Sequence, residues 1–461
     1  MATTLLFDRD YEIRVLQEVF STDKAELVII YGRRRVGKTA IVSEFLKSVP
    51  GVYLFTPRGS IQDILHAYAN DIRHQLNMFT SFSTWDDFLE FLKFISKRKI
   101  IVVIDEFQRL SEAFKPAITL LQGVWDRYLG HSKIKLVLVG STFGMIERLA
   151  LIHDAPLFGR KTREIKVSPM PYIINRNYYG NVEEEERIKL YGVFGGTPGY
   201  FTLVSKDADL FENIKTLVLD PSGPLSNAPE RLLAEETRSP ATYMSILANI
   251  SRSSKGLPLS KIHVRKGSPT VYLRNLIKMD IVDKLVSLAQ GDTTYVIKDE
   301  FFRFWFTFIY PRLALIEMRR GELLLERIKQ GLNEYLSFTF EKILREIILF
   351  TAGRKLDNVE MPVIDNIGVF WKRDIELDAC ATSKETVIVG EAKWINKKIT
   401  RRDVERLIAK AEIAAQTLKK ERWVAIYLSK KGFTKDAQKL ESDNIILLDT
   451  ENLKRILDNI L

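Results

Sequence analysis

The sequence has a single cysteine, Cys380, among its 461 residues. One thiol excludes an intramolecular disulfide and any zinc site built from several cysteines, and it fits a reducing cytoplasm. The N-terminus lacks the basic and apolar regions of a signal peptide, and no apolar run is long enough to cross a bilayer. The richest run, residues 301–310, carries Arg303 and ends at Pro311. We therefore expect a cytoplasmic protein without a membrane partner.

Acidic residues are the less common charged class. The chain has 59 Asp and Glu against 69 Lys and Arg, which gives a formal net charge of +10. This surplus makes a polyanion such as nucleic acid a plausible partner. Internal repeats and low-complexity tracts are also lacking, so an ordinary chain of two to four globular domains is expected.

The sequence is organised around a glycine loop near the N-terminus. The stretch Gly32-Arg-Arg-Arg-Val-Gly-Lys-Thr39 follows the apolar run 27–30 and precedes a helical pattern at 40–46. Its spacing is that of the P-loop, whose backbone N–H groups wrap the phosphates of a nucleotide. We expect ATP and Mg²⁺ here, with Lys38 on the β- and γ-phosphates and Thr39 on the metal. The expected nucleotide-binding residues of the loop are Gly32, Val36, Gly37, Lys38, Thr39 and Ala40.

Two further strand patterns end in polar residues of the kind that a nucleotide hydrolase uses. Residues 99–104 read as a buried strand that ends at Asp105 and Glu106. After a P-loop this is the Walker B pattern, in which Asp105 orders the Mg²⁺ shell and Glu106 polarises the attacking water. The strand at 135–140 ends at Ser141, which either senses the γ-phosphate or caps the next helix.

A resemblance is carried by five stretches, which begin at Phe7, Gly32, Ile104, Pro156 and Gly195 and read FDRDYE, GRRRVGKT, IDEF, PLFGR and GGTPGY. Together they resemble the archaeal ATPase family, a branch of the signal-transduction P-loop ATPases related to AAA+ proteins. The resemblance implies an adenine pocket near Phe7 and Arg9, and a helical lid that contains the Gly-Gly-x-Pro turn. It also implies a γ-phosphate arginine at Arg160, acting in cis or on a neighbouring subunit of an oligomer. A solvated basic strand edge is the alternative for Arg160.

A helix-rich segment with a hairpin follows the lid. Helical patterns at 242–250, 259–264 and 270–279 precede two short strands at 285–288 and 294–297, which is the order of a winged helix-turn-helix. Between Ser251 and Lys278 there are seven basic residues and no acidic one, as expected for phosphate contacts. A winged helix used for protein contacts is the alternative. The expected DNA-binding residues are Arg252, Lys255, Lys261, Arg265, Lys266, Arg274 and Lys278.

The C-terminal third has a second acidic pattern. Strand candidates at 375–381 and 386–394 carry Asp378, and Glu391 with Lys393, which point to the same side of a strand. This arrangement resembles the PD-(D/E)xK nuclease superfamily, although Leu377 replaces its usual proline. The resemblance implies catalysis by Asp378, Glu391 and Lys393, with Glu341 as a further ligand of a divalent metal, Mg²⁺ or Mn²⁺. The region also resembles the uncharacterised domain that commonly follows archaeal ATPases.

The fold class expected from these patterns is α/β. We predict a P-loop NTPase parallel-sheet domain at 1–180, a helical lid and linker at 181–233, a winged helix at 234–312, and a long helix with a restriction-endonuclease-like α/β domain at 313–461. The expected function is ATP-dependent DNA binding and processing, with metal-dependent phosphodiester cleavage. The alternative is an ATP-driven switch or scaffold that binds DNA or protein and carries an inert nuclease-like fold.

Overall fold

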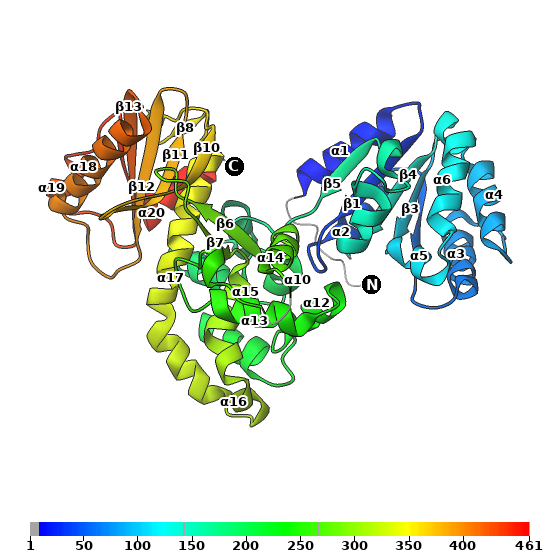
Figure 1. Ribbon diagram of the computed structural model, residues 1–461, viewed down its shortest axis with the longest axis horizontal. Coiled ribbons are helices and arrows are strands. Elements are labelled where there is room, and N and C mark those ends of the chain that lie inside the picture. Colours follow the sequence, from blue (N-terminus) through cyan, green and yellow to red (C-terminus); the bar gives the residue numbers. More distant parts are fainter. Residues whose placement is uncertain (1–8, 142, 265–266, 461) are drawn as a thin grey trace. The chain divides into compact units, whose positions relative to one another are not determined.

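The computed structural model describes residues 9–141, 143–264 and 267–460. The chain divides into two compact units (Figure 1). The first comprises residues 1–168 together with 235–238, and the second comprises residues 169–234 and 239–461. No helix in the described ranges is both long and apolar enough to cross a membrane.

The first unit is built on a five-stranded parallel sheet. Its strands are β1 (Glu26–Tyr31), β2 (Gly51–Phe55), β3 (Ile101–Asp105), β4 (Lys135–Gly140) and β5 (Arg163–Lys166), in the order β2-β3-β4-β1-β5. All neighbouring pairs run parallel. The inner strands are continuous apolar runs because helices cover both of their faces. The predicted parallel α/β domain is thereby confirmed.

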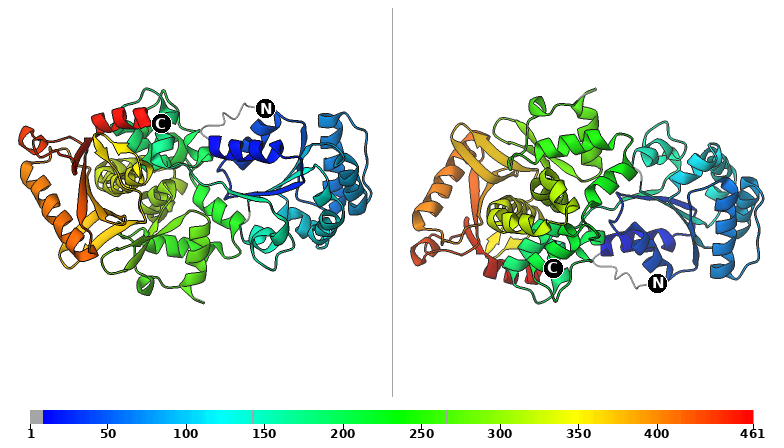
Figure 2. Two further views of the ribbon diagram at one scale, coloured as in Figure 1. Left: turned by 90° about the horizontal axis from the view of Figure 1, so that it is seen from above. Right: turned by 90° about the horizontal axis from the view of Figure 1, so that it is seen from below.

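Helices of the first unit lie on both sides of this sheet, as Figure 2 shows. Side chains of α1 (Asp10–Ser21) and α2 (Lys38–Leu46) form one apolar layer with one face of the strands. The opposite layer is contributed by α3 (Ile61–Leu76), α4 (Trp85–Ile95), α5 (Gln108–Ala113) and α6 (Ala117–Arg127). Shorter elements complete the unit: η1 (Leu129–His131), α7 (Phe143–Ile146), η2 (Glu147–Leu151) and η3 (Phe158–Arg160).

The second unit begins with short helices and the predicted glycine turn. The elements are α8 (Tyr172–Asn175), η4 (Arg176–Tyr179), α9 (Glu184–Phe194), α10 (Pro198–Phe201), α11 (Leu210–Ile214), η5 (Lys215–Leu219) and α12 (Ala228–Glu236). Gly196 lies so close to the preceding chain that an added Cβ would sit 1.7 Å from the carbonyl oxygen of Met170. The glycine is therefore required by backbone contact, and Pro198 starts the next helix.

The segment predicted as a winged helix contains α13 (Pro240–Ile250), η6 (Leu259–Lys261), α14 (Pro269–Lys278), β6 (Val282–Val286) and β7 (Thr293–Ile297). Ser268 caps α14 as predicted, and β6 pairs antiparallel with β7. The helix predicted at 259–264 is wrong, because only one 3₁₀ turn forms there. Leu257 pairs with Tyr295 through two backbone hydrogen bonds of 3.0 and 2.8 Å, which hold the chain extended just before that turn.

A long helix runs through the second unit. It is preceded by α15 (Glu300–Phe304), η7 (Trp305–Ile309), η8 (Tyr310–Arg312) and α16 (Leu313–Glu317), and the long helix itself is α17 (Gly321–Thr351). The C-terminal sheet has the order β10-β11-β12-β13-β14, with strands Asn366–Lys372, Ile375–Thr382, Thr386–Lys393, Arg422–Ser429 and Ile445–Asp449. The pairs β10–β11 and β11–β12 are antiparallel, and the other two are parallel.

The C-terminal sheet is covered by helices. Both α17 and α18 (Arg401–Leu418) pack on it, as Figures 1 and 2 show from different sides. The predicted flanking helix at 402–418 and strand at 423–429 are therefore confirmed within one residue. The remaining elements are the hairpin β8 (Lys355–Leu356) and β9 (Val359–Glu360), with α19 (Lys435–Gln438) and α20 (Thr450–Ile460).

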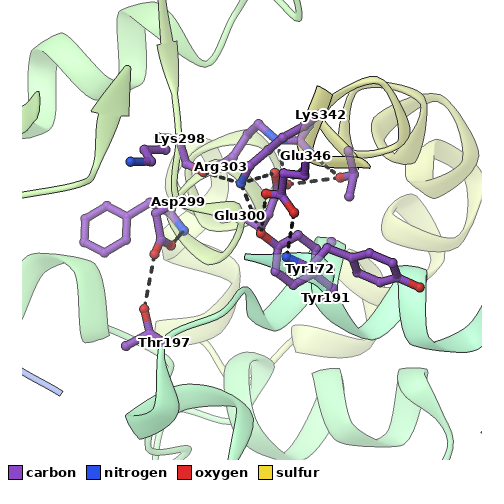
Figure 3. A network of polar contacts seen from close by, with 12 residues as sticks. Tyr172, Tyr191, Thr197, Lys298, Asp299, Glu300, Arg303, Lys342 and Glu346 are labelled. Carbon is purple, nitrogen blue, oxygen red and sulfur yellow. Dashed lines mark hydrogen bonds and ion pairs between the residues drawn. The ribbon is translucent and has the colours of Figure 1, made fainter. Parts of the chain in front are cut away.

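A buried polar network fixes the rotation of α17 within the second unit (Figure 3). Glu300 pairs with Arg303 at 2.6 Å and with Lys342 at 3.2 Å. One turn along α17, Glu346 accepts the backbone N–H of Tyr172 at 2.7 Å. Residues four apart share a face of a helix. Positions 342 and 346 therefore belong to one charged face, and positions 341 and 345 form a second one beside it.

Candidate nucleotide site and C-terminal charged site

Neighbouring backbone leaves no room for a side chain at the position where the glycine loop begins after β1. Gly32 has φ +157°, and a Cβ added to it would lie 2.1 Å from the carbonyl oxygen of Val167. Gly37 has φ +100° and stands at the N-cap of α2. The loop thus follows a strand and ends at a helix N-terminus, the arrangement that the P-loop spacing predicts.

Lys38 is buried at the start of α2. Its Nζ donates to the carbonyl oxygens of Gly32 at 2.7 Å and Arg33 at 2.9 Å, so the loop itself holds the ammonium group. Burial lowers the pKa of Lys38, and the nearby Glu236 is the carboxylate that opposes this most. The side chain is placed in the loop where a phosphate of a bound nucleotide would reach it.

Asp105 links the ends of β3 and α2. Its Oδ2 accepts hydrogen bonds from Thr39 Oγ1 at 2.8 Å and from the hydroxyl of Tyr53 at 2.7 Å. Burial, and then the neighbouring Asp105, raise the pKa of Tyr53 and keep its phenol protonated as a donor. The two predicted metal-binding side chains, Thr39 and Asp105, therefore meet, and no motif indicates that Tyr53 would join them.

Glu106 is held in an unusual backbone conformation, with φ +55°. Such left-handed geometry is uncommon for a residue with a side chain and occurs often at functional sites. Ser141 Oγ lies 2.9 Å from both carboxylate oxygens, and Gln108 Nε2 donates to one of them at 2.6 Å. The structure thus brings the predicted sensor Ser141 to the predicted water-polarising Glu106, and it adds Gln108.

Arg9 is hydrogen-bonded to the glycine loop. Its guanidinium group donates to the carbonyl oxygens of Val36 at 2.8 Å and Ser168 at 2.9 Å, and it pairs with Glu12 at 3.1 Å. These contacts explain why a buried arginine stands beside the loop. Phe7, the other half of the predicted adenine pocket, lies outside the described residues.

Arg160 forms an ion pair with Asp126. Its Nε and NH2 atoms bind the two carboxylate oxygens of Asp126 at 2.6 and 2.7 Å, and NH1 donates to the Pro156 carbonyl. Within the described chain, none of these hydrogen bonds goes to the P-loop. A role at the γ-phosphate would require Arg160 to leave Asp126.

Glu236 is a buried acid beside the P-loop that sequence reasoning missed. It belongs to the short segment 235–238 that packs with the first unit. Its Oε1 lies 3.8 Å from Arg34 Nε, and the preceding Glu235 lies 3.1 Å from the same atom. Burial raises the pKa of Glu236, while Lys38 and Arg34 oppose this rise. No motif marks this residue, because only folding brings it to a loop some 200 positions earlier in the chain.

The second candidate site, which contains the predicted nuclease-like residues, lies on the C-terminal sheet. Lys393 Nζ is 3.6 Å from Asp378 Oδ2 and 3.6 Å from Glu391 Oε2, so the three predicted catalytic residues meet. Asp378 Oδ2 also accepts the backbone N–H of Ala392 at 2.9 Å. Glu341, on α17, is close enough that burial and then Asp378 raise its pKa to about 7. The sequence predicted the convergence of these four residues.

Two cations at the same place were not predicted. Lys410, on α18, forms an ion pair with Glu391 Oε1 and donates to the Glu376 carbonyl at 3.0 Å. Arg345, on α17, donates to the Asp378 carbonyl. We call Glu341, Asp378, Glu391, Arg345, Lys393 and Lys410 the C-terminal charged site.

The donors of this site are partly suited to a divalent metal. Carboxylate oxygens are the ligands that Mg²⁺ and Mn²⁺ prefer. Over the described part of the chain, however, no group of three or more His, Cys, Asp and Glu side chains is placed to hold a metal ion. The chemistry of the donors fits a metal, but their present arrangement is one of lysine-paired carboxylates.

The predicted DNA-binding residues are mostly at the surface. Arg252, Lys261 and Arg274 are exposed, and Lys278 is partly buried. Lys255 is exposed but forms an ion pair with Glu376 of β11. Arg265 and Lys266 lie outside the described residues. Asn275 at the inner side of α14 donates to the Tyr243 hydroxyl at 2.8 Å, so it holds α14 to α13.

Comparison with known families finds a match for the N-terminal part. Residues 6–204 match the model of an ATPase domain found predominantly in Archaea. This part of the chain is therefore similar to a P-loop ATPase domain. This ATPase domain contains the glycine loop, Asp105, Glu106 and the Gly-Gly-Thr-Pro turn, so nucleotide binding is the activity that its motifs serve.

A second family model matches behind the ATPase domain. Residues 305–407 match a family of archaeal and bacterial proteins of unknown function. The match begins within η7 and ends within α18, and it includes Glu341, Asp378, Glu391 and Lys393. The resemblance to an uncharacterised domain that follows archaeal ATPases is thereby confirmed, and the family carries no activity over to this chain.

Individual proteins are also similar to this chain. An uncharacterised protein of Methanocaldococcus jannaschii is 28% identical over 412 residues, which cover 87% of this chain and 90% of that protein. An uncharacterised ATP-binding protein of the same organism is 41% identical over 44 residues, 10% of this chain and 75% of that protein. A solved Walker-type ATPase of Pyrococcus abyssi shares 21% identity, covers 65% of this chain and 96% of its own, and superposes with a TM-score of 0.48.

Proposed function

We propose that this protein couples ATP hydrolysis by its ATPase domain to the binding and metal-dependent cleavage of DNA. The single observation that carries the cleavage step is the position of Lys393, which lies 3.6 Å from Asp378 and 3.6 Å from Glu391 on two adjacent strands. Two carboxylates with a lysine between them can hold a cation, a water molecule and a phosphate in one place.

Four residues of the C-terminal charged site have a chemical role in this proposal. Asp378 and Glu391 would supply oxygen ligands to a metal, and Glu341 would supply a third. A bound divalent metal would lower the pKa of a coordinated water and so provide the nucleophile. Burial alone would lower the pKa of Lys393, but Asp378 and Glu391 outweigh it and raise that pKa. Lys393 therefore stays protonated and can offset charge that grows on the phosphate.

Replacing Lys393 by Ala tests the cleavage step. We expect nicking of supercoiled plasmid in Mg²⁺ or Mn²⁺ to fall by about a hundredfold or more, because the variant loses the group that orients the water and balances the phosphate. Initial rates are measured on agarose gels with and without ATP. Lys397→Ala is the matched control, since Lys397 is an exposed lysine four residues further along. Equal rates for wild type and Lys393→Ala, including no cleavage by either, would remove the nuclease assignment.

The winged helix is the proposed DNA-binding element. Arg252, Lys261 and Arg274 are exposed basic side chains in a stretch without acidic residues. Binding through phosphate contacts releases counterions, so affinity falls as salt rises.

Replacing Arg274 by Gln tests this placement. We expect the slope of log affinity against log salt to become shallower by about one, with a uniform loss of affinity across DNA sequences. Fluorescence anisotropy with a labelled duplex measures both quantities over a range of NaCl concentrations. Lys97→Gln, at an exposed position of the ATPase domain, should leave the slope unchanged. A slope that Arg274→Gln does not alter would show that α14 is used for another kind of contact.

A second function is favoured by one observation. Both oxygens of Glu391 face a lysine, one Lys393 and the other Lys410. Such a fully paired carboxylate suits an ATP-driven switch or scaffold in which the nuclease-like fold is inert. The plasmid assay separates the two functions, because the inert fold leaves DNA intact under every metal and nucleotide condition.

A further inference from the structure

The C-terminal charged site contains as many cationic side chains as carboxyl side chains. Its three carboxylates are Glu341, Asp378 and Glu391, and its three cations are Arg345, Lys393 and Lys410. Arg345 adds its charge from the same face of α17 as Glu341, and Glu341 and then Asp378 act on it most strongly among four carboxylates. A site without surplus negative charge attracts a divalent cation weakly, because each fixed positive charge repels it.

Lys410 makes the most direct contact of these cations. Its ammonium group pairs with Glu391 Oε1 and is held in place by the Glu376 carbonyl at 3.0 Å. Lys393 lies 3.6 Å from the other oxygen of Glu391. Mg²⁺ and Mn²⁺ bind carboxylate oxygens directly at about 2.1 Å, in the space that an ammonium group in an ion pair occupies. Lys410 and a metal therefore compete for the lone pairs and the negative charge of Glu391.

We propose that Lys410 is a tethered cation that competes with a divalent metal for Glu391, so that metal binds at this site more tightly when Lys410 leaves that carboxylate. The proposal rests on the metal-dependent function assigned above to Asp378 and Glu391. It adds a regulating residue from a helix that lies outside the acidic motif.

The surroundings of Lys410 permit such an exchange. The side chain of Glu391 is 11% exposed, whereas that of Lys410 is 30% exposed and reaches solvent. An unpaired carboxylate in the position of Glu391 would be costly, so Lys410 leaves readily only when another cation replaces it. Lys393 cannot take over this role alone, because it is shared with Asp378.

Metal binding can be measured without DNA or cleavage. The full-length, nucleotide-free protein is titrated with MnCl₂, and free Mn²⁺ is read by electron paramagnetic resonance. We expect Lys410→Gln to bind Mn²⁺ at least about tenfold more tightly than wild type, because one positive charge a few ångströms from the metal is removed. Arg402→Gln is the matched control, since it removes an exposed positive charge from the same helix.

Two further variants assign the result to this site. Lys410→Met keeps the aliphatic stem of the side chain and should show the same gain if Lys410→Gln proves poorly folded. The gain must disappear in the double variant Lys410→Gln with Asp378→Asn. Equal Mn²⁺ affinities of wild type, Lys410→Gln and Lys410→Met would overturn the proposal, as would a gain that survives Asp378→Asn. A Lys410→Gln protein that binds Mn²⁺ tightly and leaves plasmid intact would sustain it while removing the nuclease function.

Discussion

Glu106→Gln is expected to abolish ATP turnover while ATP binding persists. Glutamine has the shape of glutamate but cannot accept a proton from the attacking water, and loss of a general base costs about 10²- to 10⁴-fold in rate. The side chain is already oriented, because Ser141 lies 2.9 Å from both oxygens and Gln108 donates at 2.6 Å. Phosphate release measures turnover, and binding of a fluorescent ATP analogue measures affinity.

The left-handed backbone conformation of Glu106 is kept in the glutamine variant, so the test reports on the carboxylate alone. Both glutamate and glutamine carry a Cβ, so the strain at φ +55° is the same in the two proteins and stability should not separate them. Glu112→Gln, at an exposed position of α5, is the matched control and should hydrolyse ATP like wild type. If Glu106→Gln turns over ATP at the wild-type rate, Glu106 is not the residue that activates water.

Lys38→Ala is expected to weaken ATP binding by about a hundredfold, the scale of losing one charge-assisted hydrogen bond in a site sheltered from water. The ammonium group now donates to the carbonyls of Gly32 and Arg33, and a bound phosphate would replace these partners. Turnover should fall with binding. Isothermal titration calorimetry measures the affinity, and Lys47→Ala, an exposed lysine just after α2, is the matched control.

The pH dependence adds a second test of Lys38. Burial lowers its pKa to about 8, so wild-type affinity for ATP should begin to fall as the pH rises past that value and the side chain loses its charge. Lys38→Ala has no such group and should show a flatter profile above pH 8. Because the substitution also removes the cation that acts most strongly on Glu236, thermal unfolding of both proteins is followed in parallel. Undiminished ATP binding by a folded Lys38→Ala protein would contradict the assignment of the loop.

Several elements were predictable because their signals are local. The loop from Gly32 to Thr39 requires glycine where the backbone turns tightly, and such steric rules act within a few residues. The strand predicted at 99–104 is found at Ile101–Asp105, because a run of β-branched residues between helical segments has few alternatives. In contrast, three of the four residues of β5 (Arg163–Lys166) are charged, and only one of its positions is buried. The sequence therefore has no apolar pattern from which this edge strand could be predicted.

The sequence by itself determined which residues are the candidates for chemistry in this protein. It specified the P-loop, the pair Asp105 and Glu106, and the convergence of Asp378, Glu391 and Lys393, because strand periodicity and motif spacing place those side chains without reference to the rest of the chain. Only the tertiary structure decided which further side chains meet them. Tyr53 reaches Asp105, Glu236 approaches Lys38, and Lys410 pairs with Glu391. These contacts depend on how helices and strands distant in sequence pack together, and packing is set by the whole core rather than by any local pattern.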